Sequence, residues 1–417
     1  MKRKEGNSVK IMQFERFIAE RLYFSQQTEG RSSRPAVRVA LAGLIIGVMV
    51  MIITVCVVVG FKQTVTDKVV GFAAHLRIVN FENNNTFELS PIVVPDSMMQ
   101  ALAAIPHIES VNAFVTKPGI IKTNEAFQGI VFKGTTYWNY FADNLIEGHL
   151  PEAENEVILS RKLCDLMNLQ LGDAVMSYFV GESVKVRKFT IAGIYRTGFT
   201  EFDERFILGQ MNVVRRLNGW SDDQISGVEV RVDNLRNLYA ASDDVFFATA
   251  NRFDENGNGY YMETMEQLNP AVFSWLDLLD MNVIIIILLM LAVSGFSIIS
   301  GLIILILDSI QLVGVLKALG ATNKQVRGVF ITQGVMLIGK GVIWGNILGL
   351  VLCAIQYFGH ILPLDATTYY VNYVPIAFPV GWLLLLNVGT ILVSTLILLA
   401  PSAIITKISP SQVMRFE

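Results

Sequence analysis

The chain has 417 residues, enough for two or three domains, and a formal net charge of only −3. Hydrophobic residues make up 52% and charged residues 17%, and the mean hydropathy is positive. These values exclude an ordinary soluble protein and place the chain with membrane proteins. The three cysteines imply no disulfide framework, since two of them, Cys56 and Cys353, lie in apolar runs.

Residues 1–36 are predicted to form a cytoplasmic segment. Residues 1–38 carry nine Lys/Arg against four Glu, and residues 10–25 place apolar side chains at helical spacing. This pattern predicts an amphipathic helix on the membrane surface, with its basic groups toward anionic headgroups. Residues 37–60 form the first predicted transmembrane helix, and Gly43 and Gly47 give it a small-residue pair that permits close helix packing.

Residues 61–281 are predicted to form a periplasmic α/β domain with two subdomains, the inner one at about 116–224. Strand patterns occur at 75–81, 108–117, 127–134, 184–195, 205–209, 225–232 and 260–264, and helical patterns at 95–104, 211–217 and 265–280. A short helix capped near Ser160 is also expected. Residues 61–280 hold 18 Lys/Arg against 29 Asp/Glu, an acidic balance that argues against nucleic acid as a partner.

Three more apolar runs follow, at residues 282–307, 328–358 and 381–405. The connecting segments are 308–327 and 359–380, and a tail covers 406–417. Lys and Arg favour cytoplasmic loops, and they occur in the first connection and the tail but not in residues 359–380. The sequence therefore predicts an α-helical membrane protein with four transmembrane helices. Its mixed α/β extracytoplasmic domain is inserted between helices 1 and 2.

The segment 308–327 reads as a short amphipathic helix at the cytoplasmic face. Its apolar stripe has helical spacing and consists of Leu312, Val315, Leu316 and Leu319. Asp308 and Ser309 are candidates to cap its start, Gly320 to end it, and Lys317 suits the negative end of the helix dipole. Two interpretations stay open, because such a helix can lie in the lipid headgroups or dock into a groove on a soluble partner.

The third apolar run contains one ionisable residue, Lys340. By helix rise it lies roughly 18 Å from a start at Gly328, near the middle of a bilayer. Such a group usually faces a bundle interior or a wet cavity, although it can also reach toward the membrane surface. Gly341, Gly345 and Gly349 form a small-residue ridge on the same helix, which indicates a packing face.

Groups for catalysis are missing from the sequence. No two of the four histidines have metal-ligand spacing, so no metal site is expected. The run from Gly334 to Gly341 resembles a phosphate-binding loop but has glycine where Ser or Thr must bind magnesium. We therefore expect a protein that is not an enzyme and holds no cofactor.

Several ordered segments carry a family resemblance. They are GFKQTVTDKVVGFAAHLRI (60–78), VILSRKLCDLMNLQLGDAV (157–175), FTIAGIYRTGFTEFDERFIL (189–208), GVLKALGATNKQV (314–326) and PSAIITKISPSQVMRFE (401–417). With one span before the domain and three after it, the chain resembles the FtsX/MacB-type permeases of ABC transporters. The resemblance is greatest to the lipoprotein-releasing permeases LolC and LolE.

This resemblance implies a permease subunit in the bacterial inner membrane that extracts lipoproteins for transfer toward the outer membrane. It also implies a separate ABC ATPase subunit that binds ATP and Mg, a second copy or paralogue of the permease, a lipoprotein substrate and a periplasmic lipoprotein carrier. The ATPase would dock on the coupling residues Leu312, Gly314, Val315, Leu316, Lys317, Leu319 and Gly320. An alternative is a mechanotransmission permease that acts on a cell-wall hydrolase, as FtsX does, or on an efflux substrate, as MacB does.

Extracting an acyl chain from a bilayer costs ~0.8 kcal/mol for each CH2 group, so the chains need an apolar shelter as well as an energy source. We expect this shelter, together with membrane lipid, between the first and second spans of paired subunits. The candidate residues of this path are Val48, Met49, Ile52, Ile286 and Met290.

Overall fold

The computed structural model describes residues 34–83, 88–123, 126–181 and 183–402. The chain divides into two compact units. The first, here called the bundle, contains the chain up to Phe61, Asp277–Leu362 and the chain from Val374 onward; the second, the head, contains Lys62–Leu276 and Pro363–Tyr373. The amphipathic helix predicted at residues 10–25 and the tail at 406–417 lie outside the described residues.

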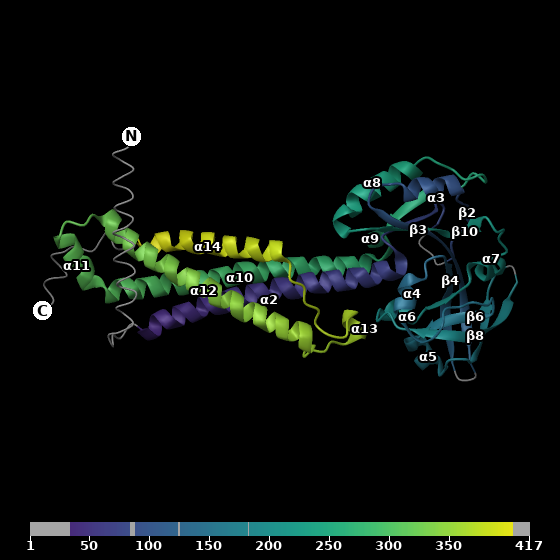
Figure 1. The fold of residues 1–417 in the computed structure, drawn as a ribbon, viewed down its shortest axis with the longest axis horizontal. Coiled ribbons are helices and arrows are strands. Elements are labelled where there is room, and N and C mark those ends of the chain that lie inside the picture. The colour runs from purple at the N-terminus through teal and green to yellow at the C-terminus, as the bar shows by residue number, and fades with distance from the viewer. Residues whose placement is uncertain (1–33, 84–87, 124–125, 182, 403–417) are drawn as a thin grey trace. The chain divides into compact units, whose positions relative to one another are not determined.

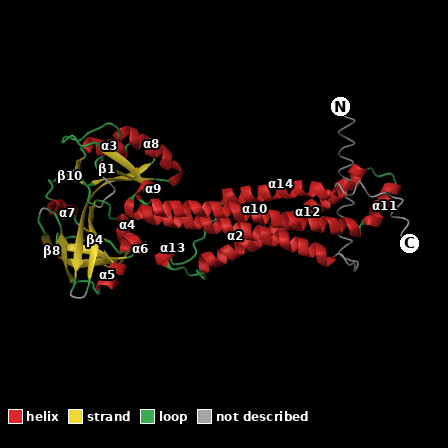
Figure 2. Cartoon of the chain, turned by 180° about the vertical axis from the view of Figure 1, so that it is seen from behind, coloured by secondary structure: helices red, strands yellow, loops and turns green. Residues whose placement is uncertain are grey.

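Long helices build the bundle, and they run side by side in both views (Figures 1 and 2). They are α2 (Arg34–Ala73), α10 (Pro270–Asp308), α12 (Asn323–Gly359) and α14 (Val380–Ser402), with the short α11 (Ile310–Ala318) between α10 and α12. Four helices of the described chain are long and apolar enough to cross a membrane, at Val37–Ala73, Pro270–Asp308, Asn323–Gly359 and Val380–Ser402.

Three of these helices are longer than the predicted spans. Helix α2 continues past Gly60 to Ala73, α10 begins at Pro270 rather than near residue 282, and α12 begins at Asn323 rather than Gly328. The apolar runs predicted the spans, but a helix continues for as long as its backbone hydrogen bonds do, so polar turns can extend it.

The head is built on a ten-stranded sheet with the order β12-β1-β11-β3-β4-β9-β6-β8-β5, in which β7 pairs with both β3 and β8. Its strands are β1 (Leu76–Asn80), β3 (Ile108–Lys122), β4 (Phe127–Thr135), β5 (Leu145–Gly148), β6 (Glu156–Ser160), β7 (Ala174–Phe179), β8 (Lys185–Tyr195), β9 (Phe206–Gly209), β11 (Gly227–Val232) and β12 (Tyr260–Thr264). The pairs β4–β9 and β6–β8 are parallel and the others antiparallel. A separate pair joins β2 (Ile92–Val93) to β10 (Gln224–Ile225).

Strand β3 is longer than predicted and connects the two parts of the sheet. It pairs with β11 as far as Phe114, with β4 from Phe114 onward and with β7 from Ile120 onward. Pro118 is tolerated because it lies where β3 has no neighbour on that side, between the end of β11 and the start of β7. The predicted subdomain boundary near residue 116 therefore falls inside one continuous strand.

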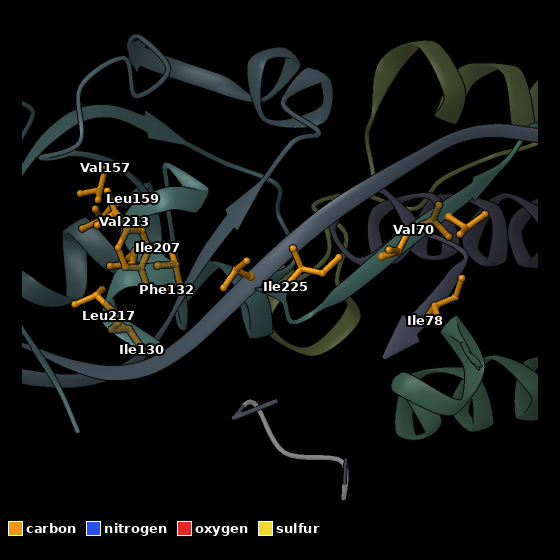
Figure 3. Close-up of a cluster of buried hydrophobic side chains, with 14 of the residues drawn as sticks. Val70, Ile78, Ile130, Phe132, Val157, Leu159, Ile207, Val213, Leu217 and Ile225 are labelled. Atoms are coloured by element: carbon orange, nitrogen blue, oxygen red, sulfur yellow. The ribbon is translucent and has the colours of Figure 1, made fainter. Parts of the chain in front are cut away.

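The head also contains short helices. They are α3 (Asp96–Ala103), α4 (Asn139–Asp143), α5 (Arg161–Met167), α6 (Thr200–Asp203), α7 (Met211–Asn218), α8 (Leu238–Thr249), α9 (Met265–Leu268) and α13 (Ala366–Tyr369). Of these, α3, α5, α7, α8 and α9 pack against strands of the sheet. Ser160 caps α5 as predicted, since its hydroxyl accepts the N–H of Leu163 at 2.9 Å. Figure 3 shows the main apolar core, where Phe132, Leu159 and Ile207 of three strands meet Val213 and Leu217 of α7.

Several helical regions differ from the prediction, since α4, α6 and α13 lie in no predicted helix. The helix predicted at 265–280 is two helices, α9 and α10, which separate at Asn269. Pro270 opens the second, a position where its missing N–H costs nothing. Helix α8 was not predicted at all.

Candidate functional site

One face of α11 packs against the rest of the bundle. Val313 is fully buried, Gly314 is buried, and Val313 shares an apolar cluster with Val326 and Phe330 of α12. The opposite face is open, with Val315 56% and Leu319 81% exposed. Because these two residues are one helical turn apart, they form a continuous apolar strip on the surface of the chain.

The remaining predicted coupling residues lie around this strip. Leu312, Leu316 and Lys317 are half-buried, and Gly320 is exposed. Within the predicted stripe, Val315 and Leu319 are exposed, whereas Val313, which lies outside it, is buried.

Helix α11 ends as predicted but does not begin as predicted. Gly320 has a φ of 92°. Its N–H bonds to the carbonyl of Lys317, and the N–H of Ala321 bonds to that of Leu316, which is a Schellman end. At the start, the side chain of Ser309 makes no capping hydrogen bond within the described chain, because Ser309 alone separates α10 from α11 and its N–H bonds back to Leu305.

A capping box that sequence reasoning missed follows the Schellman end. The hydroxyl of Thr322 accepts the N–H of Gln325 at 3.4 Å, and the side-chain oxygen of Gln325 accepts the N–H of Thr322 at 2.8 Å. The T-x-x-Q pattern was visible in the sequence. With both termini capped, the turn between α11 and α12 is well defined.

The glycine ridge of α12 lies directly against α2. A Cβ atom on Gly341, Gly345 or Gly349 would come within 2.3 to 3.2 Å of, respectively, Leu44, Val48 and Ile52. Only residues without side chains permit this approach. This contact between the ridge and α2, here called the seam, fully buries Val48 and Ile52, two of the residues predicted to lie on the substrate path.

The other predicted packing pair faces α10. Cβ atoms on Gly43 and Gly47 would lie 2.5 Å from the hydroxyl of Ser297 and 2.1 Å from that of Ser294. Of the remaining path residues, Met49, Ile286 and Met290 are half-buried. On α10, the neighbouring Ile285 and Leu288 are more exposed.

Lys340 lies on the outer surface of the single chain. Its side chain is exposed, while the next residue, Gly341, belongs to the buried seam. Because α12 begins at Asn323, Lys340 is about 25 Å from the start of the helix by helix rise. Lys340 therefore does not face the bundle interior of this chain.

In the head, two of the family-like segments meet around Lys68. Its ammonium group donates to the carbonyls of Gly198, at 3.2 Å, and Tyr370, at 2.9 Å. Gly198 has a φ of 70°, and a Cβ there would lie 2.8 Å from Lys68 Nζ. The ring of Tyr370 stacks on Phe199 at 4.7 Å. Residues 363–373, which connect α12 to α14, are thus docked on the head.

A buried carboxyl completes this junction. Asp203 accepts hydrogen bonds from the Thr197 hydroxyl at 2.7 Å and the Gly198 N–H at 3.1 Å. Burial raises the pKa of Asp203, against the effect of these bonds and of Lys68 nearby. Among the described residues, no cluster of three or more His, Cys, Asp or Glu could hold a metal ion.

Two family models match the chain. Residues 39–245 match the MacB-like periplasmic core domain, and residues 284–410 match the FtsX-like permease C-terminal part. These matches define the class: a permease of the FtsX/MacB type.

The similar proteins include lipoprotein-releasing permeases. The lipoprotein-releasing system transmembrane protein LolC of Neisseria meningitidis is 21% identical over 398 residues, covering 91% of this chain and 94% of LolC. The corresponding LolE of Haemophilus influenzae is 22% identical over 422 residues, covering 92% and 96%. The crystal structure of the periplasmic region of MacB from Actinobacillus actinomycetemcomitans aligns with 48% of this chain and 94% of its own, with 14% identity and a TM-score of 0.34. Along more than nine tenths of its length, the chain is similar to the LolC and LolE permeases.

Proposed function

We propose that this chain is the permease subunit of an ABC transporter that releases lipoproteins from the inner membrane. A separate ATPase subunit docks on α11 and drives movement that reaches the head. The observation that carries this proposal is the exposed apolar strip, Val315 and Leu319, on a helix whose other face is fixed to the bundle. A rigidly held apolar strip suits a protein partner, which it can push against.

The charge distribution supports the orientation. The basic residues of the first 38 positions and of the α11 segment favour a cytoplasmic location for both, where an ATPase has access. The acidic head then lies on the periplasmic side, where a soluble lipoprotein carrier and the substrate would meet it. ATP and Mg belong to the ATPase subunit.

The free-energy cost of extracting acyl chains supports a separate ATPase subunit. At ~0.8 kcal/mol for each CH2 group, removing an anchor with two or three acyl chains costs on the order of tens of kcal/mol. A second copy or a paralogue would complete an apolar shelter for the chains. Since Val48 and Ile52 are buried in the seam, we place the shelter along Met49 and the α10 side chains Ile286 and Met290, extended to the exposed Ile285 and Leu288.

The docking is tested by co-purification of the ATPase with Val315→Asp and Leu319→Asp, separately and combined. Both positions are exposed, so the changes leave the packing of the bundle intact, whereas a charge at Gly314 would also disrupt its buried face. Phe247→Asp, an equally exposed apolar position on α8 of the head, is the matched control. We expect the ATPase to be lost from the α11 variants and kept by the control. An ATPase that stays bound to the double variant rules out α11 as the dock.

The substrate class is tested by depletion of the protein in its own cell. We expect outer-membrane lipoproteins to accumulate in the inner membrane. Correct lipoprotein placement after depletion, together with a defect in cell-wall hydrolysis or efflux, would instead support the FtsX-like or MacB-like alternative.

A further inference from the structure

The end of α2 inside the head is bound by two cations from distant strands. Arg231 of β11 donates from Nη1 to the carbonyl of Val70 at 2.6 Å and from Nη2 to that of Gly71 at 2.9 Å. Lys133 of β4 donates from Nζ to the carbonyl of Phe72 at 2.9 Å. The last carbonyls of a helix have no partners within it. These bonds give partners to the carbonyls of Gly71 and Phe72, and they add a second donor to that of Val70, which also accepts the N–H of Ala74 at 2.8 Å.

The three side chains that make this arrangement are buried. Lys133 and Glu229 are each 3% exposed and Arg231 is 4% exposed. The ammonium group of Lys133 forms an ion pair with Glu229 at 2.6 Å, and the guanidinium of Arg231 lies over the ring of Tyr137 at 3.9 Å. Two buried cations thus share one carboxylate, and the negative end of the α2 dipole balances the second positive charge.

The sheet register explains how the group meets the helix. Glu229 and Arg231 are two positions apart on β11, so their side chains share one face of the sheet. Strand β3 separates β11 from β4, which brings Lys133. The end of α2 is therefore bonded to two strands on either side of β3, rather than joined to the sheet only by the peptide that leads into β1.

We propose that Lys133, Glu229 and Arg231, here called the helix-end clamp, are positioning residues that make the sheet of the head follow movement of α2. This inference rests on the proposed function, because it requires movement of the membrane helices to reach the head. Charge-assisted hydrogen bonds to a rigid helix end transmit displacement, whereas a flexible connection would absorb it.

The test uses the full chain co-expressed with its ATPase subunit and reconstituted in lipid. Amide hydrogen exchange of β4 and β11 is measured with and without ATP, and lipoprotein release is measured per ATP hydrolysed. Arg231→Met removes the two bonds to α2. Arg77→Met is the matched control, because Arg77 forms a similar ion pair in the same sheet, with Glu263 at 2.7 Å, and makes no hydrogen bond to the helix end within the described chain.

We expect the wild-type head to change its exchange on ATP binding, and Arg231→Met to lose this response. Release per ATP should fall at least about tenfold in Arg231→Met, within the range of coupling between distant sites, while ATP hydrolysis continues. Arg77→Met should keep both the exchange response to ATP and the release of lipoprotein per ATP. If Arg231→Met does not fold, Arg231→Lys serves instead, since it keeps the charge but cannot hold two carbonyls as a planar fork does.

A second variant separates coupling from folding. The exchange Lys133→Glu with Glu229→Lys restores the ion pair but leaves Phe72 facing a carboxylate, so we expect a folded head with a lost response. A response to ATP that survives in folded Arg231→Met and in the exchange variant, or an equal loss in Arg77→Met, overturns the clamp alone. A wild-type head that does not respond to ATP would overturn the proposed function and the clamp with it.

Discussion

The seam between α2 and α12 depends on single hydrogen atoms in place of side chains. A Cβ on Gly345 would lie 2.6 Å from the Cβ of Val48, whereas Gly339, on the same helix, has no described atom within 4 Å of its Cβ position. Gly345→Ala should therefore destabilise the bundle by about 1–3 kcal/mol through overpacking. Gly339→Ala should be neutral or slightly stabilising. Unfolding by SDS in mixed micelles measures both, and equal behaviour of the two variants would contradict the seam.

His75 makes the stability of the head depend on pH. It is buried, its Nδ1 accepts the N–H of Val232 at 3.0 Å, and burial together with the charge of Arg231 lowers the pKa of His75 to about 4. In the unfolded chain, where a His has a pKa of about 6.5, His75 binds a proton at pH values at which it stays neutral in the folded head. This contribution to stability is thus complete above about pH 6.5 and is lost as the pH falls toward about 4, by up to about 3 kcal/mol.

Urea unfolding of the full chain at pH 7 and pH 5, followed by head tryptophan fluorescence, measures this effect. His75→Gln keeps an acceptor for the Val232 N–H but cannot be protonated, so its stability should fall less between the two pH values. Parallel losses in the two proteins would exclude His75 as the cause.

Single residues also show where sequence reasoning fails. The ridge Gly341–Gly345–Gly349 could be found because glycine at four-residue spacing is a signal in itself. The burial of Val48 and Ile52 in the seam could not be predicted, because the positions of α2 near them are apolar and the sequence carries no record of which side faces a neighbour. The surface location of Lys340 depends likewise on the rotation of α12, which packing sets.

Among the elements, the turn between α11 and α12 determines the orientation of the exposed apolar strip, Val315 and Leu319. Gly320 has a φ of 92°, a conformation in which a Cβ is unfavourable. Gly320→Ala should cost about 1 kcal/mol and weaken ATPase binding, because the orientation of α11 becomes less fixed. Gly320→Asn should do less harm, since asparagine tolerates this region. Titration of the ATPase onto the permease compares the two, and equal affinities would contradict the role of the turn.

The loop that links α12 to α14 was predicted as a plain connection, yet it packs on the head. Tyr370 contacts Phe199 at 4.7 Å and Trp275 at 5.9 Å. Tyr370→Ala should lower the stability of the head by about 1–3 kcal/mol, at roughly 0.5–1.5 kcal/mol for each aromatic pair, and Tyr370→Phe should keep most of it. Thermal unfolding measured by near-UV circular dichroism tests this, and an unchanged Tyr370→Ala would show that these aromatic contacts contribute nothing.

Element prediction succeeded where turn residues bound a strand pattern. Strand β12 was predicted with its observed bounds because a polar turn precedes Tyr260 and Tyr261, although burial along the strand does not alternate. Helix α8 was missed because its buried positions include Ala241 and Thr249, while the aromatic Phe246 and Phe247 are exposed. The usual rule that large apolar residues mark the buried face is reversed there, and only tertiary contacts show it.

At the scale of the whole molecule, order along the chain predicted the class: one apolar run, an acidic α/β domain and three further runs. The clamp could not be predicted in this way, because Lys133 and Arg231 reach α2 only through the pairing of β4, β3 and β11. Charged residues within strand patterns read as surface positions until the fold shows that a helix end lies over them.

The central claim is that α11 and the head lie on opposite sides of the membrane. The native cysteines Cys56, Cys164 and Cys353 are all buried, so single cysteines at the exposed Leu319 and Phe247 can be labelled separately with a membrane-impermeant maleimide in intact spheroplasts. The account predicts that Phe247→Cys reacts at once and Leu319→Cys only after the membrane is permeabilised. Labelling of both from the outside, or of neither before permeabilisation, would contradict it.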